Sequence, residues 1–368
     1  LPFWASGGLM ALALLSKYNA AALLLAGAAC GLLRGAGARR VGAWCLLGCS
    51  GLAVYFGLDA LSGGRAMTAA WTVTSQAAGL PTSCASHRLR SLLAFLGGGG
   101  LVIAVWPLLL WRLQPRVAGA AAVLSLFLFS PLFDLGLVRP VDRVTGAVLG
   151  FGTILALAAA LRPSPGRTLW LPWLASGLAL AAAYWSVMAR TVLLAVPPAI
   201  FLLAGLLEER FTARACRGLC LASLAAVLGL GLALSIVDFR YAGSQRELAR
   251  EVSSRYLEQG RRVWFTGHWG LQYYLERAGA RSLDAGRGGW DEVRAGDVVV
   301  VPRVNANILR PSRRLLADVT RSEVSSFLPL RLICSGRCEA GFYSDVMGFL
   351  PFSLSREPVD VHEVVEAL

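Results

Sequence analysis

Long apolar runs with few charges restrict this chain more than any other feature. A helix that crosses a membrane needs about 20 mostly apolar residues. Seven stretches meet that requirement: 41–61, 91–111, 117–137, 144–161, 169–188, 191–207 and 218–237. Two shorter apolar segments, 3–15 and 20–33, precede them and are either two kinked spans or a partly re-entrant hairpin. The pattern predicts a polytopic α-helical membrane protein, a helix bundle with about seven to nine spans.

The composition supports this interpretation and weakens a nucleic-acid role. Of the 368 residues 56% are hydrophobic and 15% are charged, and the mean hydropathy is +0.60. A soluble domain carries roughly 25% charged residues. The formal net charge of +13 is spread in short clusters between apolar runs, as basic residues at the ends of membrane helices are. We therefore expect no nucleic-acid binding.

The basic residues also predict the orientation. Short arginine-bearing loops alternate with other loops along the chain, and they lie at 34–40, 112–116, 162–167 and 210–217. Basic short loops face the cytoplasm. The loops 62–90 and 138–143, the turn at Arg190 and everything after residue 237 then lie outside. This predicts a multi-pass protein of the cell (inner) membrane with an extracytoplasmic C-terminal domain.

The segment 238–368 has the composition of a soluble domain. Residues 244–259 are predicted as an amphipathic helix and 271–278 as a second helix. Short buried strands are predicted at 262–265, 297–301 and 330–333. Strand, helix and strand in this order indicate a small α/β domain. The sequence therefore divides into a helix bundle, 1–237, and an extracytoplasmic α/β domain, 238–368.

The cysteines and histidines do not predict a metal site. None of the eight cysteines forms a CxxC pair, and the three histidines are far apart in the sequence. Cys334 and Cys338 alone lie close together in the polar C-terminal region. An oxidising compartment would allow a disulfide there, and the sequence leaves both states open. It assigns no cofactor.

Lys17 and Arg190 are the strongest candidates for function. Lys17 is the only lysine and interrupts an apolar run; an ionisable group at such a depth indicates function, and the alternative is a snorkelling side chain at a helix end. Arg190 stands at the predicted outer mouth between two apolar helices, shortly before Pro197 and Pro198, which should kink the second helix. A guanidinium there suits a bidentate contact to a lipid phosphate, and the alternative is an interfacial anchor.

Other polar residues fall on the predicted outer face. Asp142, between Arg139 and Arg143, predicts an ion pair within its loop. His268 follows a predicted strand, where a site at the strand end or a structurally bonded loop histidine is expected. The remaining candidates for an outer-face site are Tyr18, Asp59, Arg65, His87 and Arg88.

Glycines occur in two groups inside apolar runs, Gly97 to Gly100 and the pair Gly229 and Gly231. Phosphate-binding loops need a preceding strand and a following Lys-Ser/Thr pair, and neither group has them. Close packing of helices is the expected role of both groups.

Four segments resemble bacterial glycosyltransferases of the family 39 type, relatives of protein O-mannosyltransferases and lipid A aminoarabinose transferases with the membrane fold called GT-C. GLMALALLSKYNAAALLL, residues 8–25, resembles their Lys-Tyr element. ARTVLLAVPPAIFLLAGLL, residues 189–207, resembles their Arg-Tyr-Leu-Leu-Pro helix, with Thr191 where Tyr is usual. RVWFTGHWGLQYYLERAGAR, 262–281, and AGFYSDVMGFLPFSLS, 340–355, resemble the outer domain of one bacterial branch.

The resemblance implies an inverting enzyme that moves a sugar from a polyprenyl-phosphate donor, a membrane lipid, to an acceptor on the outer face. It implies that Lys17 and Arg190 bind the donor phosphate. The base of such enzymes is an aspartate in the first outer loop, several helices before the Lys-Tyr element. That aspartate is expected upstream of Leu1, so the sequence is expected to be truncated at its N-terminus.

Two other functions stay open at this point. A transporter or flippase would show matching broken helices in two related halves, and no such symmetry stands out in the sequence. A non-catalytic membrane module would use its outer domain to bind a partner. The sugar and the acceptor are not determined by the sequence.

Overall fold

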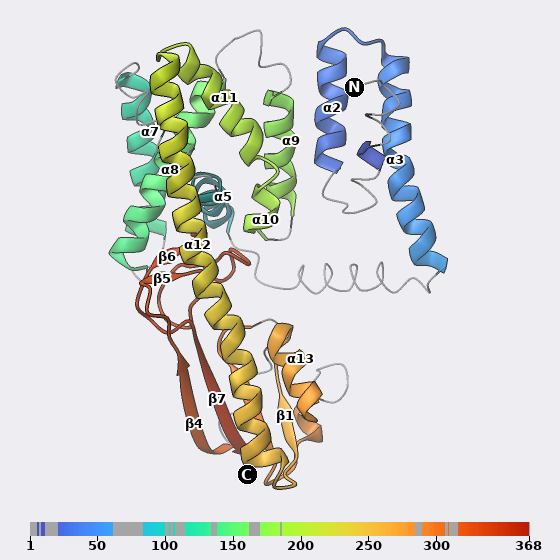
Figure 1. Ribbon diagram of the computed structural model, residues 1–368, viewed down its shortest axis with the longest axis vertical. Helices are drawn as coiled ribbons and strands as arrows, with labels where there is room; N and C mark the ends of the chain where they lie inside the picture. Colours follow the sequence, from blue (N-terminus) through green and yellow to red (C-terminus); the bar gives the residue numbers. More distant parts are fainter. Residues whose placement is uncertain are drawn as a thin grey trace. The chain divides into compact units, whose positions relative to one another are not determined.

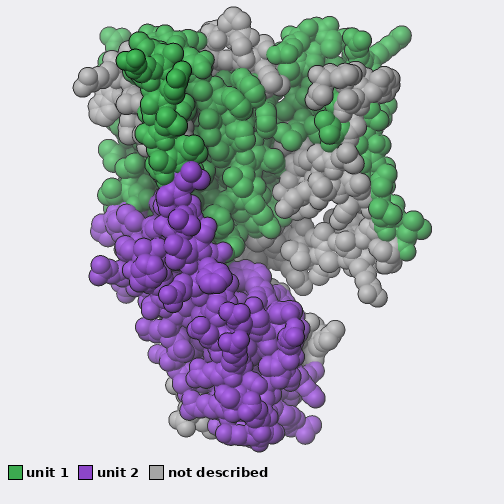
Figure 2. Space-filling model, viewed as in Figure 1, with its two compact units in different colours: residues 1–136, 143–227, 341–351 green, residues 137–142, 228–340, 352–368 purple. Residues whose placement is uncertain are grey.

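A computed structural model describes residues 6, 9–11, 21–61, 84–99, 103, 106, 115–133, 138–161, 170–184, 186–283, 289–305, 308 and 316–367. These residues form two compact units, coloured green and purple in Figure 2. Unit 1 is 1–136, 143–227 and 341–351, and unit 2 is 137–142, 228–340 and 352–368. Each unit thus contains a short segment from a distant part of the sequence, and each is described by itself below.

Unit 1 is helical (Figure 1). Each of the seven predicted apolar stretches contains a described helix, so the helical prediction is confirmed for them. The helices are α2 (Ala21–Leu33), α3 (Ala38–Leu61), α5 (Ala85–Gly99), α7 (Pro115–Leu128), α8 (Pro140–Ala160), α9 (Trp170–Ala183), α10 (Ala189–Val192), α11 (Val196–Glu208) and the first part of α12 (Ala213–Val252). A 3-10 turn, Pro131–Phe133, follows α7.

Two of the described helices, α8 and α12, are long and apolar enough to cross a membrane. A single helix of this kind is also found in the core of soluble proteins, where it is buried. The apolar window of α12 differs, because only 6% of it is buried. Leu224 is 55% exposed and Leu232 is 65% exposed. The exposed apolar surface of α12 is therefore unlike that of a buried helix in a soluble core.

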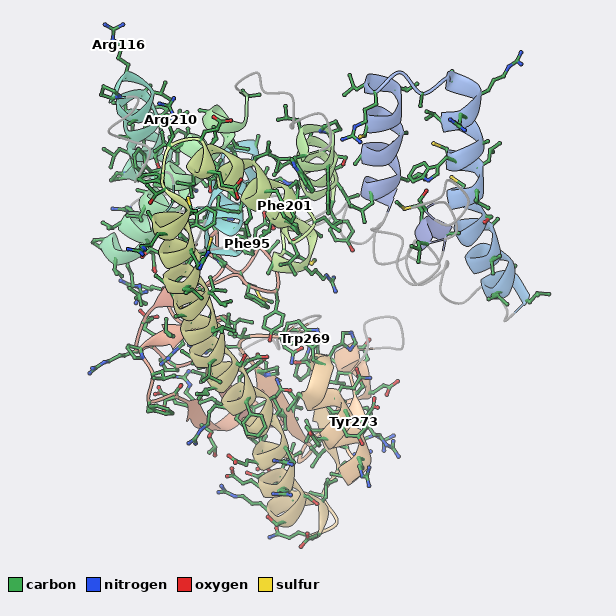
Figure 3. All side chains as sticks on the ribbon, turned by 45° about the horizontal axis from the view of Figure 1, so that its top comes forward. Phe95, Arg116, Phe201, Arg210, Trp269 and Tyr273 are labelled. Carbon is green, nitrogen blue, oxygen red and sulfur yellow. A yellow bond between two sulfur atoms is a disulfide. The ribbon has the colours of Figure 1, made fainter. Side chains whose placement is uncertain are left out.

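The core of unit 1 is formed mainly by α5, α9, α10 and α11. Phe95 of α5 and Leu203 of α11 are almost completely buried in it. Trp170 stacks on Phe201 with ring centroids 4.4 Å apart, and Trp106 Nε1 donates a hydrogen bond to Ser223 Oγ at 2.8 Å. Figure 3 labels Phe95 and Phe201 on their helices. Large side chains rather than polar contacts thus hold these helices together.

The two glycine groups have different surroundings. A Cβ on Gly97 would stand 2.4 Å from the carbonyl oxygen of Leu149, so this glycine allows α5 and α8 to pack closely. The packing explanation is confirmed there. Within the described part of the chain no atom lies within 4 Å of a Cβ built on Gly229 or Gly231. Close packing is wrong for that pair, because α12 exposes this part of its surface.

Unit 2 contains a five-stranded mixed sheet with the strand order β2-β1-β3-β7-β4. Strand β1 pairs in parallel with β2 and β3, and β7 pairs antiparallel with β3 and β4. Helix α13 connects β1 to β2 and makes a β-α-β unit (Figure 1). The bounds are β1 Val263–Phe265, α13 Trp269–Ala278, β2 Arg281–Ser282, β3 Val298–Pro302, β4 Leu316–Val324 and β7 Asp360–Ala367.

Alternate residues of these strands bury opposite faces of the sheet. Phe265 and Val300 pack with Leu248 of α12 and Leu275 of α13 on one face. Trp264 of β1 and the β3 residues that flank Val300, namely Val299 and Val301, pack on the other face. Partly buried Trp290, Val293 and Ile308 cover them. Period-two alternation places neighbours on opposite sides, so the predicted α/β layer arrangement is confirmed for unit 2.

The predicted elements of the C-terminal region are found, with two differences. The amphipathic helix predicted at 244–259 is the end of α12, which continues into a π-helix, Ser253–Leu257, without a break at residue 238. Strands β4 and β7 were not predicted. The expected domain boundary at 237/238 stays a prediction, and the compact units divide the chain nearby, between Val227 and Leu228.

A second, two-stranded sheet joins β5 (Leu330–Arg331) and β6 (Ser353–Leu354). Arg139 Nε lies 2.9 Å from Asp142 Oδ2, so the predicted loop ion pair is confirmed. The same guanidinium donates to the Ser353 hydroxyl at 2.7 Å, which ties the start of α8 to β6. Cys334 and Cys338 form a disulfide in this region.

Truncation of a core leucine in unit 2 tests the packing. Leu275 is fully buried between α13 and the sheet, whereas Leu354 on β6 is 47% exposed. We expect Leu275→Ala to lower the free energy of unfolding by about 2–5 kcal/mol and Leu354→Ala by less than about 1 kcal/mol. Thermal unfolding of the purified chain would measure both. Equal losses would contradict the described core.

Candidate functional site

Three distant segments of the sequence meet inside unit 1. The amide of Ala189 donates to the carbonyl of Phe342 at 3.2 Å, and the amide of Asp345 donates to the carbonyl of Val187 at 2.9 Å. The amide of Gly341 donates to the carbonyl of Leu350 at 2.8 Å and closes 341–350 into a loop. Two of the segments that carry the family resemblance, 189–207 and 340–355, are thus in direct backbone contact.

The carboxylate of Asp345 is the centre of this junction. Its Oδ1 accepts hydrogen bonds from the Ser186 hydroxyl at 2.7 Å and from the backbone amide of Val187 at 3.1 Å. The hydroxyl oxygens of Ser186 and Ser344 lie 2.6 Å apart. Asp345 and Ser186 are fully buried. A buried carboxylate is tolerated only where hydrogen bonds satisfy it, so Ser186 and Asp345 hold the two segments in register.

Helix α5 supplies the third segment. His87 Nε2 lies 2.8 Å from the carbonyl oxygen of Asp345, and the Arg88 guanidinium donates to the carbonyl of Tyr184. The Arg90 guanidinium lies 4.9 Å from the ring centroid of Phe349. His87 also meets the edge of the Phe349 ring, with centroids 6.2 Å apart. One turn of α5 therefore contacts the 341–351 loop at two places, Asp345 and Phe349.

Arg190 lies beside this junction on α10. The four-residue helix is closed by Thr191, whose hydroxyl donates to the carbonyl of Met188 at 2.9 Å and accepts from the amide of Met188 at 3.2 Å. Arg190 itself is exposed. Its guanidinium forms no ion pair or hydrogen bond with the described part of the chain. A cation of this kind can accept an anionic ligand without first breaking an internal pair.

The chain changes direction just after Arg190. A non-helical turn at 193–195 separates α10 from α11, whose first residues include Pro197 and Pro198. Proline lacks the amide that a continuous helix would need and fits the first turn of a new one. The predicted interruption is confirmed, and it leaves Arg190 at the end of a short helical turn rather than inside a long helix.

The other predicted site residues are distributed unevenly. His87, Arg88 and Arg190 belong to unit 1, and the structure brings the first two into the junction. His268 belongs to unit 2. Asp59 lies in α3, but its side chain is outside the described residues, as are Lys17, Tyr18 and Arg65. The convergence of Lys17 with Arg190 therefore stays a prediction.

His268 is held at the carboxyl end of β1. Its amide donates to Asn305 Oδ1 at 2.8 Å, and Asn305 Nδ2 donates back to the His268 carbonyl at 3.1 Å. The ring Nδ1 lies 2.8 Å from Gln272 Oε1, one turn along α13. Trp269 follows with a φ of 61°, a backbone conformation that residues other than glycine rarely adopt. Of the two expected roles, these contacts favour the structurally bonded loop histidine.

Cys84, directly before α5, has an altered acidity. A hydrogen bond with the Ser86 hydroxyl lowers the pKa of the Cys84 thiol below its ordinary value. A backbone hydrogen bond at His87 and the positive charge of Arg90 act in the same direction. The thiol is exposed, so it should react readily with alkylating agents at neutral pH.

Sequence reasoning missed Asp345 and Ser186. Asp345 stands inside the 340–355 segment that carries part of the resemblance, yet nothing in the sequence distinguished it from a surface carboxylate. Ser186 interrupts an otherwise apolar stretch, which is a weak signal. Their pairing across about 160 residues becomes visible only in the structure.

The described residues offer few alternatives for chemistry. Among them, no group of three or more His, Cys, Asp and Glu side chains could hold a metal ion. Comparison with known protein families, with curated proteins and with solved structures found no match. The family resemblance therefore stays a prediction.

Loss of the Ser186 hydroxyl tests the junction. Ser186→Ala removes one donor from the buried carboxylate of Asp345, and we expect a loss of about 1–3 kcal/mol in the free energy of unfolding. Ser235→Ala is the matched control, because the exposed Ser235 hydroxyl has one hydrogen bond within the described part of the chain, to the Gly231 carbonyl of its own helix. Thermal unfolding would measure both variants. An equally small effect of the two substitutions would contradict the junction.

Proposed function

We propose that this chain is part of a membrane glycosyltransferase that takes a sugar from a polyprenyl-phosphate donor and transfers it to an acceptor on the outer face. The observation that carries the proposal is the junction in unit 1. Two segments that carry the family resemblance, 189–207 and 340–355, contact each other beside Arg190. Arg190 has no internal partner among the described residues. A phosphate-bearing ligand suits a cation placed in this way.

The proposed reaction is a displacement at the anomeric carbon of the sugar. The acceptor oxygen forms a bond to that carbon while the bond to the donor phosphate oxygen breaks and the phosphate keeps the electron pair. The acceptor proton passes to a base, which we assign to none of the described residues. Arg190, with Lys17 as its predicted second cation, would stabilise the charge that develops on the leaving phosphate.

Asp345 has a different role in this proposal. Its carboxylate is buried and already accepts hydrogen bonds from Ser186 and Val187, so it is not available to an acceptor hydroxyl. It fixes the backbone of 186–190 relative to the 341–351 loop. We therefore propose Asp345 as a positioning residue that sets the place of Arg190.

We further propose that the helices form a polytopic bundle in the cell membrane, with unit 2 outside the cytoplasm. The exposed apolar window of α12 and the length of α8 support a membrane location. Four shorter apolar helices, at 23–33, 115–128, 170–183 and 196–208, are compatible with further spans. The disulfide between Cys334 and Cys338 supports an oxidising compartment for unit 2.

Substitution of Arg190 tests the catalytic part of the proposal. In membranes that hold the natural full-length protein, we expect Arg190→Ala to reduce sugar transfer about 10²–10³-fold. Arg190→Lys should restore part of the activity because it keeps the charge and loses the planar fork. Transfer of radiolabelled sugar from a polyprenyl-phosphate donor would measure the rate.

The matched control for this experiment is Arg116→Ala. Arg116 is also exposed and lies at the start of α7, where Figure 3 shows its side chain pointing away from the helices. It belongs to a predicted cytoplasmic loop, so we expect full activity. Unchanged transfer in Arg190→Ala, with normal amounts of protein in the membrane, would remove the assigned role.

Labelling of Cys84 tests the orientation. Cys84 belongs to the loop 62–90, which is predicted to face outside, and the lowered pKa of its thiol raises the thiolate fraction at neutral pH. A membrane-impermeant maleimide should therefore label intact cells at this residue, more slowly as the pH falls, and Cys84→Ser should remove the label. Labelling of Cys84 only after permeabilisation would contradict the proposed orientation.

A further inference from the structure

Two cavities of unit 2 open on the same face of the sheet, beside α12. The larger, about 510 Å³, is lined by residues of α12 and β4 and by His362 of β7. The smaller, about 450 Å³, includes Thr320 of β4 and Val364 of β7. Thr320 pairs with Val364 in the β4–β7 ladder, and Ser322 pairs with His362. Residues two apart on a strand face the same side, so the cavities lie on successive rungs of one ladder.

We call this region the α12–β4 groove. Figure 1 shows α12 running alongside β7 and β4, and Leu248 of α12 and Val364 of β7 belong to one packed cluster. Cavities of about 300–1,000 Å³ are typical of small-molecule sites. Its lining is mainly ionic and hydrogen-bonding, and it includes Ser244, Glu247 and Ser322 at the larger cavity and Gln259 and Thr320 at the smaller one.

The charges of the groove are balanced. Four arginines and four glutamates line the two cavities. Arg261 already pairs with Glu366, with nitrogen and oxygen 2.8 Å apart. A polyanion or a polycation would meet as much repulsion as attraction in such a place. The groove therefore suits a ligand without net charge that offers many hydrogen-bonding groups.

A buried imidazole lies at the larger cavity. His362 is 1% exposed, and its Nε2 lies 3.2 Å from Asp360 Oδ2. Asp360 is held by its other oxygen, which accepts the amides of Arg303, Val304 and Val361 at 2.7–3.1 Å. The contact between Nε2 and Oδ2 lacks hydrogen-bond alignment, and neither atom has another hydrogen-bond partner in the described part of the chain. Buried polar groups normally have such partners.

The remaining lining residues complete a mixed surface. Three serine hydroxyls, those of Ser244, Ser322 and Ser325, line the larger cavity together with the 74% exposed ring of Phe239. Tyr256 lines the smaller one. Sugar rings carry hydroxyls around their edge and apolar C–H groups on their faces. Carboxylates, guanidinium groups and hydroxyls can bind the edge, and aromatic rings can cover the faces.

We propose that the α12–β4 groove binds a neutral saccharide, with the exposed Glu247 and Ser322 as hydrogen-bonding groups and with His362, packed against Asp360, as the buried wall of the larger cavity. The two cavities together offer room for more than one sugar ring. This binding needs no donor lipid and no transfer chemistry. The proposal therefore goes beyond the proposed transferase activity, and each can fail without the other.

Binding can be measured on the full chain in nanodiscs. The probes are neutral tetrasaccharides of glucose, mannose, galactose and N-acetylglucosamine, followed by saturation-transfer NMR and calorimetry. We expect at least one probe to bind with little dependence on salt, because no net charge is neutralised. Glu247→Gln and Ser322→Ala should each weaken that binding about tenfold or more.

Two further variants complete the design. Glu276→Gln, which changes an exposed glutamate of α13 outside the groove, is the matched control and should bind as the unchanged protein does. His362→Gln should abolish binding. Because His362 is buried and this variant could fail to fold, the two exposed substitutions carry the decision. No binding of any probe at about 10 mM, or equal binding by all variants, would overturn the proposal.

Discussion

The hydrogen bonds to the buried carboxylate of Asp345 are the interaction on which the candidate site depends. The Ser186 hydroxyl and the Val187 amide reach the same oxygen, and the backbone bonds at Ala189 and Asp345 run beside them. A carboxylate without these donors could not stay away from water. Its burial therefore explains why residues 341–351, which lie in the C-terminal region of the sequence, belong to unit 1.

Unit 2 uses buried carboxylates in the same way. Asp297 accepts from the indole of Trp264 at 2.9 Å and pairs with Arg262 at 3.0 Å, which fixes the start of β3 beside β1. Asp360 accepts three amides at the end of β3 and the start of β7. Each of these carboxylates lies at the start of a strand. It accepts hydrogen bonds from groups at the ends of strands that pairing within the sheet would leave without partners.

The apolar pattern predicted the helices because each stretch is long enough for several turns, even where a proline pair, Pro197 and Pro198, starts a new helix within it. The strands were harder to predict. β1 and β3 are continuous apolar runs and were found, whereas β7 carries Asp360, His362 and Glu363 among its valines and lacks such a run. β4 mixes charged residues with few apolar ones. As the edge strand of the sheet, it obtains its structure from pairing with β7 rather than from its own composition.

The sequence by itself determined the helical character of the apolar stretches, the α/β character of the C-terminal region and the choice of Arg190 as a candidate site residue. These follow from local period, length and charge. Only the tertiary structure decided that 341–351 packs in unit 1, that Ser186 and Asp345 are partners, and that His362, which contacts Asp360, lines a cavity beside α12. The physical reason is that a buried polar side chain is recognised by its partners. For Ser186 and Asp345 those partners lie 159 residues apart in the sequence, where no local pattern reaches.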